Sequence, residues 1–78
     1  MEIKVYVTST CPYCHAAKAL LEKKGLSYET IDVTGDDDAR QKLVEAAGGR
    51  TTVPQIFIDG KSIGGYQELA QMAENGKL

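Results

Sequence analysis

Cys11-Pro12-Tyr13-Cys14 stands where a strand-like pattern of residues gives way to a helix-like one. Before it, apolar residues alternate with others at the period of a β-strand, at Ile3, Val5 and Val7. After it, apolar residues recur at the three- and four-residue spacing of a buried helix face, at Ala17, Leu20, Leu21 and Leu26. The two cysteines, which are the only ones in the chain, are therefore expected at the start of a helix that follows a strand.

This position predicts different chemistry for the two thiols. Pro12 suits the first position of a helix because its φ is fixed and it lacks an N–H, which makes Cys11 the N-cap. A thiolate at the N-cap gains the unpaired N–H groups of Tyr13 and Cys14 and the positive end of the helix dipole. We therefore expect Cys11 to be the nucleophile and Cys14 to be more buried and less acidic.

Two structural explanations of the cysteine pair are less favoured. A zinc site takes four ligands, and this chain offers two cysteines and one histidine, His15, which points away from Cys14 on a helix. A structural disulfide would close a very short loop, and such disulfides stabilise a protein little. A Cys-x-x-Cys pair within a strand–helix pattern favours redox chemistry instead.

Length and composition indicate one small globular domain, spanning 1–78, with 42% hydrophobic residues. The net charge is −2, and no basic stripe is available for nucleic-acid phosphates. No apolar run approaches the length of a membrane span or a signal-peptide core. We therefore expect a cytoplasmic protein that binds neither nucleic acid nor membrane and acts as a monomer.

The remaining patterns complete an α/β arrangement. The acidic run 36–38, which follows Gly35, lacks the further carboxylates of a calcium loop, so we expect Asp36 or Asp37 to cap a helix that ends at Gly48-Gly49. Asp59-Gly60 is a strong hairpin signal. The expected elements are strand 3–7, helix 12–24, strand 27–32 parallel to the first, helix from 37 or 38 to about 47, strand 55–58, strand 61–63 and helix 66–75. The order β-α-β-α-β-β-α predicts a four-stranded mixed sheet flanked by three helices.

Three separated motifs together resemble the glutaredoxin family, and in particular the short bacterial dithiol glutaredoxins of the glutaredoxin 3 type. They are Cys11-Pro12-Tyr13-Cys14, Thr52-Val53-Pro54 and Gly64-Gly65. The resemblance spans the whole chain and implies a thioredoxin fold and glutathione-dependent thiol-disulfide exchange. In such a mechanism Cys11 attacks a protein–glutathione mixed disulfide or a protein disulfide. The attacking thiol is then expected to be exposed, and Cys14 to be close and shielded.

The resemblance also implies residues that bind glutathione as the reductant. Val53, within the motif that includes Thr52, would pair its backbone with the tripeptide, and Pro54 would follow a cis peptide bond. Gly65, Tyr66 and Gln67 would open a helix whose free N–H groups suit the γ-glutamyl carboxylate.

Other positions implied by the resemblance lie elsewhere in the chain. Tyr13 would form a wall of the groove beside the nucleophile. Gln41 or Arg40 would reach the glycine carboxylate, although a solvated helix face explains these two residues equally well. His15 is expected to be a solvated residue, with a role as general base to Cys11 as the alternative.

Two departures from the family pattern affect the expected affinity. Thr8 occupies a place where many members carry a lysine, and Gln67 stands in a region where members often have an acidic pair. Gln67 offers an amide oxygen and no charge to the glutathione amine, so we expect weaker glutathione binding, by about 1 kcal/mol.

Two other functions are alternatives to glutathione-dependent reduction. One is an electron carrier to ribonucleotide reductase that depends on thioredoxin reductase, and such carriers lack part of the glutathione pattern. The other is a homodimer that binds a [2Fe-2S] cluster through Cys11 and bound glutathione, which the stiffening effect of Pro12 disfavours.

Overall fold

The computed structural model describes residues 1–9 and 11–78 and contains the seven expected elements in the expected order. They are β1 (Ile3–Val7), α1 (Pro12–Lys23), β2 (Glu29–Asp32), α2 (Asp37–Ala46), β3 (Gln55–Ile58), β4 (Lys61–Gly64) and α3 (Tyr66–Glu74). None of the helices in these residues is long and apolar enough to span a membrane. The chain has the predicted β-α-β-α-β-β-α order of the thioredoxin fold.

The four strands form one mixed sheet in the order β2-β1-β3-β4. β1 pairs in parallel with β2 and antiparallel with β3, while β3 and β4 form an antiparallel hairpin. The hairpin turn places Asp59 at φ 52° and Gly60 at φ 82°, the left-handed backbone that an Asp-Gly turn supplies readily. The apolar strand β3 is an interior strand of the sheet, between β1 and β4.

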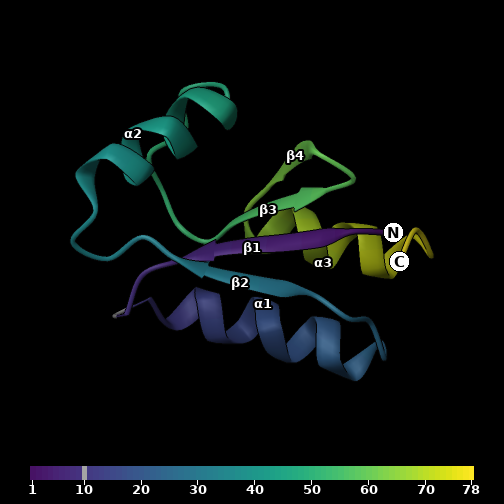
Figure 1. Ribbon diagram of the computed structural model, residues 1–78. Helices are drawn as coiled ribbons and strands as arrows, with labels where there is room; N and C mark the ends of the chain where they lie inside the picture. Colours follow the sequence, from purple (N-terminus) through teal and green to yellow (C-terminus); the bar gives the residue numbers. More distant parts are fainter. Residues whose placement is uncertain (10) are drawn as a thin grey trace.

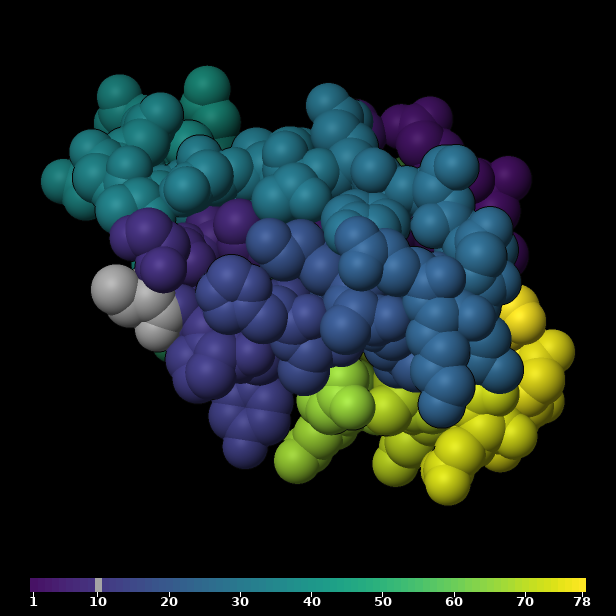
Figure 2. Space-filling view, turned by 90° about the horizontal axis from the view of Figure 1, so that it is seen from below, coloured from purple at the N-terminus to yellow at the C-terminus, as the bar shows by residue number. Residues whose placement is uncertain are grey.

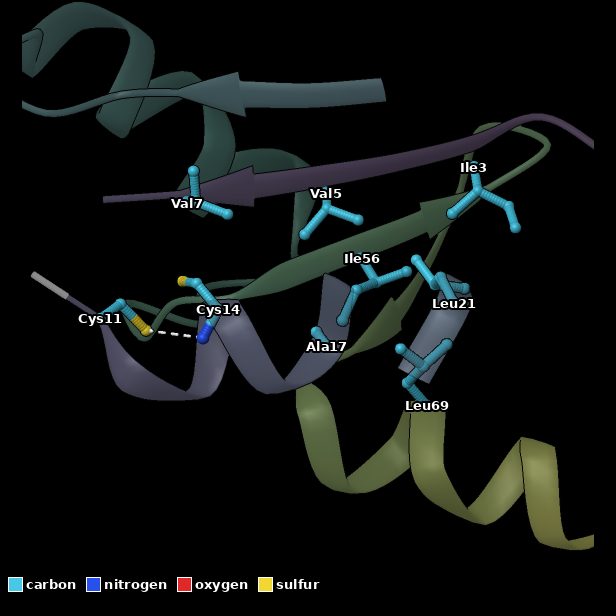
Figure 3. Packing of buried hydrophobic residues seen from close by; sticks show 9 residues of the cluster. All are labelled: Ile3, Val5, Val7, Cys11, Cys14, Ala17, Leu21, Ile56 and Leu69. Carbon is cyan, nitrogen blue, oxygen red and sulfur yellow. Dashed lines mark hydrogen bonds between the residues drawn. The ribbon is translucent and has the colours of Figure 1, made fainter. Parts of the chain in front are cut away.

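The helices lie on the two faces of the sheet (Figure 1). α1 and α3 cover one face, which is the face that Figure 2 shows, with the yellow-green start of α3 beside the chain of α1. Their main core contains Ile3, Val5, Val7, Cys11, Cys14, Ala17, Leu21, Ile56 and Leu69 (Figure 3). α2 packs on the other face, where a second, smaller core contains Val33, Leu43, Ala47 and Phe57.

Element boundaries differ from prediction by one or two residues. β2 begins at Glu29 instead of Ser27, because its ladder with β1 starts where Glu29 pairs with Lys4. β4 continues to Gly64, which pairs with Ile56 across an irregularity in the β3–β4 register. α1 and α3 each end one residue early, and the residues predicted to be last, Lys24 and Asn75, are the C-caps.

Asp36 is the cap of α2, one of the two residues predicted for that role. Its Oδ1 accepts a hydrogen bond from the N–H of Ala39 at 3.0 Å. The two acids that follow, Asp37 and Asp38, lie in the first turn, where the helix dipole favours negative charge. The acidic run therefore has a local role as the start of a helix.

Candidate active site

Cys11 lies at the N-cap of α1, with Pro12 as the first helical residue, as predicted. The N–H of Cys14 donates to Cys11 Sγ at 3.2 Å (Figure 3). This is one of the two donors expected from the first turn. The sulfur of Cys11 therefore sits at the positive end of a helix and next to a backbone donor, an arrangement that suits a thiolate nucleophile.

The expectation of an exposed Cys11 is wrong, because only 8% of the residue is accessible to solvent. The loop that leads into β3 passes over the start of α1, and Cys11 Sγ donates to the carbonyl oxygen of Val53 at 3.4 Å.

Cys14 is the more buried of the two thiols, with 2% of the residue accessible. Burial, followed by the hydrogen bond with Cys11, raises the pKa of the Cys14 thiol from 9.0 to about 11. Both thiols are free, with no disulfide between them. The structure therefore confirms that Cys14 is the shielded, weakly acidic partner, which stays protonated at neutral pH.

A groove of about 290 Å³ lies beside the cysteine pair. Its lining residues are Tyr13, Arg50, Thr52, Val53, Pro54, Gly65, Tyr66, Gln67 and Glu68. All the residues predicted to bind glutathione are among them, except the two alternatives on α2, Gln41 and Arg40. Val53 links the groove to the nucleophile, because it lines the groove and its carbonyl accepts the bond from Cys11.

The walls of the groove come from three parts of the chain. The Val53–Pro54 peptide bond is cis. On the opposite wall, a Cβ on Gly65 would lie 3.2 Å from the Pro54 carbonyl oxygen, so a glycine allows the loop and α3 to approach closely. At the N-terminus of α1, the Tyr13 ring lies 6.1 Å from the Tyr66 ring between centroids, and Tyr13 is 62% exposed.

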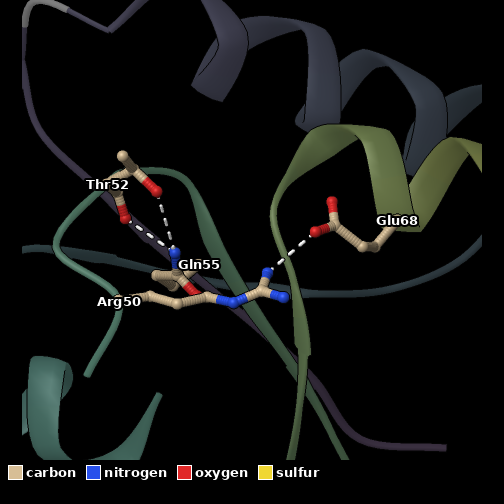
Figure 4. Close-up of polar contacts among 4 residues, drawn as sticks. All are labelled: Arg50, Thr52, Gln55 and Glu68. Carbon is tan, nitrogen blue, oxygen red and sulfur yellow. Dashed lines mark hydrogen bonds and ion pairs between the residues drawn. The ribbon is translucent and has the colours of Figure 1, made fainter. Parts of the chain in front are cut away.

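Gln55 stabilises the loop before β3, which forms one wall of the groove. It is fully buried at the start of β3, and its Nε2 donates to the Thr52 carbonyl oxygen at 2.7 Å (Figure 4). Its Oε1 is buried without a hydrogen-bond partner among the described residues. The bond from Gln55 fixes the backbone of Thr52 immediately before the cis peptide bond.

The two candidates on α2 lie outside the groove lining. Gln41 is exposed and lines a separate hollow on the surface of α2 with Asp38, Lys42 and Glu45. Arg40 donates from Nη2 to the Thr51 carbonyl oxygen at 2.9 Å and so anchors the loop that leads to the groove. His15 is exposed on α1.

Arg50 and Glu68 line the groove and were not predicted from the sequence. Arg50 Nη1 and Glu68 Oε1 form an ion pair at 2.8 Å (Figure 4). Above all the hydrogen bond from Arg50, and then backbone N–H groups at the start of α3, lower the pKa of the Glu68 carboxyl below its usual value. The two residues are 18 positions apart on different elements, so no local spacing reveals the pair. The only sequence features that pointed to these two residues are their positions next to predicted motifs. Arg50 lies shortly before Thr52, and Glu68 follows the paired glycines.

Comparisons with known proteins agree with this fold and site. A family model described as glutaredoxin matches residues 3–63. Glutaredoxin 3 of Escherichia coli K12 is 45% identical over 76 residues, which covers 97% of this chain and 90% of the relative.

Two solved structures are similar along nearly the whole chain. A buckwheat glutaredoxin–glutathione complex has a TM-score of 0.86 and 35% identity, covering 97% of this chain and 71% of the other. A glutaredoxin from Brucella melitensis has a TM-score of 0.85 and 38% identity, covering 99% and 83%.

Proposed function

Because this chain belongs to the glutaredoxin family of thiol-disulfide oxidoreductases, we propose that it reduces protein–glutathione mixed disulfides and protein disulfides with glutathione as the reductant. The observation that carries this proposal is the bond between Cys11 Sγ and the Val53 carbonyl, which joins the nucleophile to the groove. One of the structural neighbours is a glutaredoxin–glutathione complex, which supports the same ligand here.

The first step is an attack by the Cys11 thiolate on the glutathione sulfur of a mixed disulfide. The S–S bond to the protein substrate breaks, the substrate leaves as a thiolate that takes up a proton, and a Cys11–glutathione disulfide forms. The N–H of Cys14 and the dipole of α1 stabilise the negative charge on Cys11 before the attack and again when Cys11 is the leaving group.

The adduct is resolved in one of two ways. A second glutathione thiolate attacks the adduct, which releases oxidised glutathione and the Cys11 thiolate. Alternatively, Cys14 loses its proton and attacks Cys11, which releases glutathione and leaves an internal disulfide that two further glutathione molecules reduce. The raised pKa of Cys14, at about 11, slows this second route at neutral pH and favours the first.

In the groove, the proposed roles of the residues follow from their positions. The backbone of Val53, beside Thr52 and Pro54, pairs with the glutathione main chain. Tyr13 forms the wall next to Cys11. The N–H groups of Gly65, Tyr66 and Gln67 receive the γ-glutamyl carboxylate. Gln41, on α2, remains a predicted contact of the glycine carboxylate, outside this groove.

A coupled assay with glutathione, glutathione reductase, NADPH and a mixed-disulfide substrate tests the proposal. We expect Cys11→Ser to be inactive, since no other thiol is placed at the helix N-terminus beside the groove. We expect Cys14→Ser to keep part of the activity, because a second glutathione can resolve the adduct. Activity that survives in Cys11→Ser would show that the nucleophile is wrongly assigned.

The same protein separates the two alternative functions. An electron carrier that depends on thioredoxin reductase would turn over with that enzyme and NADPH in the absence of glutathione. A cluster-binding homodimer would become coloured after anaerobic reconstitution with iron and sulfide. For the proposed function we expect neither result, and a monomer that acts in the cytoplasm, where glutathione is kept reduced.

A further inference from the structure

The Arg50–Glu68 ion pair crosses the groove from one wall to the other. Arg50 belongs to the loop between α2 and β3, while Glu68 lies in the first turn of α3 (Figure 4). Gly64 makes room for the pair, because a Cβ at this position would come within 2.6 Å of Arg50 Nη1 and 2.8 Å of Glu68 Cδ. Gly64 also has φ +112°, a conformation that side chains rarely adopt.

Stability does not explain this ion pair. The two side chains are 50% and 39% exposed, and ion pairs this accessible contribute about 0–1 kcal/mol. The location is more informative. Among the described residues that line the groove, Arg50 is the one cation and Glu68 the one acid.

Glu68 places its carboxylate where the groove is best suited to an anion. Gly65 is the N-cap of α3, so Glu68 is the third helical residue, from which a glutamate side chain can fold back over the helix start. Its Oε2 is 4.0 Å from the position that a Gly65 Cβ would occupy, and its Oε1 contacts Arg50. The side chain thus lies between the guanidinium and the N–H groups that open α3.

A ligand with a free carboxylate would bind the same groups as Glu68, namely the Arg50 guanidinium and the N–H groups that open α3. Glutathione carries two carboxylates, and the structure offers one guanidinium in the groove, already engaged by Glu68. A guanidinium binds carboxylates through paired N–H donors, and the pair with Glu68 uses only Nη1. Arg50 is therefore the strongest available partner for a ligand carboxylate. In the free protein, however, it is already paired with Glu68.

We propose that Glu68 acts as an internal substitute for the ligand carboxylate, and that Arg50 exchanges Glu68 for the α-carboxylate of the γ-glutamyl group when a glutathionyl group binds. This inference rests on the proposed function and adds two roles to it. Arg50 determines specificity for a ligand with a carboxylate, and Glu68 limits the affinity for that ligand. We assign Arg50 to the carboxylate of the γ-glutamyl end, and not to that of the glycine end, because its guanidinium lies against Gly64, immediately before the start of α3.

Neutralising each member of the pair distinguishes this exchange from a purely structural ion pair. Arg50→Gln removes the partner of the ligand carboxylate and should weaken binding. Glu68→Gln removes the competitor and should strengthen it. A pair that only held the two walls together would be broken equally by both substitutions, and binding would weaken in both.

The measurement is the equilibrium between the Cys14→Ser protein and oxidised glutathione, which yields the Cys11–glutathione adduct and one free glutathione. We expect Arg50→Gln in this background to lower the equilibrium constant about fivefold, and Glu68→Gln to raise it about twofold to threefold. Bis(2-hydroxyethyl) disulfide, which has no carboxylate, is the control substrate, and its equilibrium should be the same in all three proteins. Unchanged midpoints of urea unfolding would exclude a loss of folding as the cause.

Esterified oxidised glutathione tests which carboxylate is bound. With the glycine carboxylates masked, the fivefold effect of Arg50→Gln should persist. Loss of that effect would overturn the assignment to the γ-glutamyl end.

The failure of this inference is distinguishable from failure of the proposed function. If the Cys14→Ser protein forms adducts with both disulfides equally well, the proposed function is wrong. If it prefers oxidised glutathione but both substitutions weaken the adduct, the proposed function stands and the exchange at Arg50 is refuted.

Discussion

The two thiols of the Cys-x-x-Cys motif differ because they face different surroundings across a single helical turn. Cys11 receives the N–H of Cys14 and lies at the positive end of α1, next to the groove. Cys14 points into the main core with Ala17 and Leu21. The cost of charging a thiol in that apolar setting is what raises its pKa to about 11.

This raised pKa of Cys14 predicts how stability depends on pH. The folded value of about 11 lies above the ordinary value of 9.0, so the stabilising contribution is complete below pH 9 and is lost as the pH rises through 11. We expect the free energy of unfolding of the reduced protein to fall more steeply between pH 9 and 11 than that of Cys14→Ala. Urea unfolding at several pH values, with reductant present, measures this. Equal slopes in the two proteins would contradict the prediction.

Gln67 offers a second test at the scale of one side chain. It lines the groove without a charge, where the glutathione amine is expected. Gln67→Asp should lower the Michaelis constant for glutathione about fivefold, which corresponds to about 1 kcal/mol. Gln71→Asp, on an exposed position further along α3, is the matched control and should leave the constant unchanged. An unchanged Michaelis constant in Gln67→Asp would refute the idea that the missing charge weakens binding.

At the scale of secondary-structure elements, each helix start has a different function. α1 begins with a cysteine at the N-cap, so its free N–H groups serve a sulfur atom. α3 begins with Gly65, which has no side chain to cap the helix and leaves the N–H groups to Glu68 or to a ligand. α2 is capped by Asp36, whose side chain accepts from the Ala39 N–H, so this N–H is satisfied within the helix itself.

The cap of α2 can be tested independently of catalysis. Asp36→Ala removes the acceptor for the Ala39 N–H and should lower the free energy of unfolding by about 0.5–2 kcal/mol. Lys42→Ala, at an exposed position of the same helix, should change it by less than about 0.5 kcal/mol. Chemical denaturation measures both, and the initial rate of the coupled assay should be unchanged in both proteins. An equal loss of stability in the two variants would argue against a capping role.

At the scale of the whole molecule, the groove exists because the sheet brings distant segments together. The antiparallel pairing of β1 with β3 places the loop 50–54 beside the N-terminus of α1. The β3–β4 hairpin then returns the chain so that Gly65 meets Pro54. Nucleophile, backbone wall and helix start thus come from three separate segments, and the first two, at Cys11 and Val53, are 42 positions apart in the sequence.

The sequence by itself determined the features that depend on local chemistry. The alternation of Ile3, Val5 and Val7, the proline after Cys11 and the Asp-Gly turn each act within a few residues, so their patterns predicted the elements and their order correctly. The family resemblance then identified most of the residues that line the groove.

Only the tertiary structure decided how the site is closed and charged. Cys11 is buried because Val53, far along the chain, covers it, and Arg50 meets Glu68 because two separate elements converge above Gly64. Burial and ion pairing depend on distances in space, which the packing of helices on the sheet sets and which residue spacing does not encode. The sequence therefore predicted a reactive cysteine beside a ligand groove but not the Arg50–Glu68 ion pair across that groove, which depends on the fold.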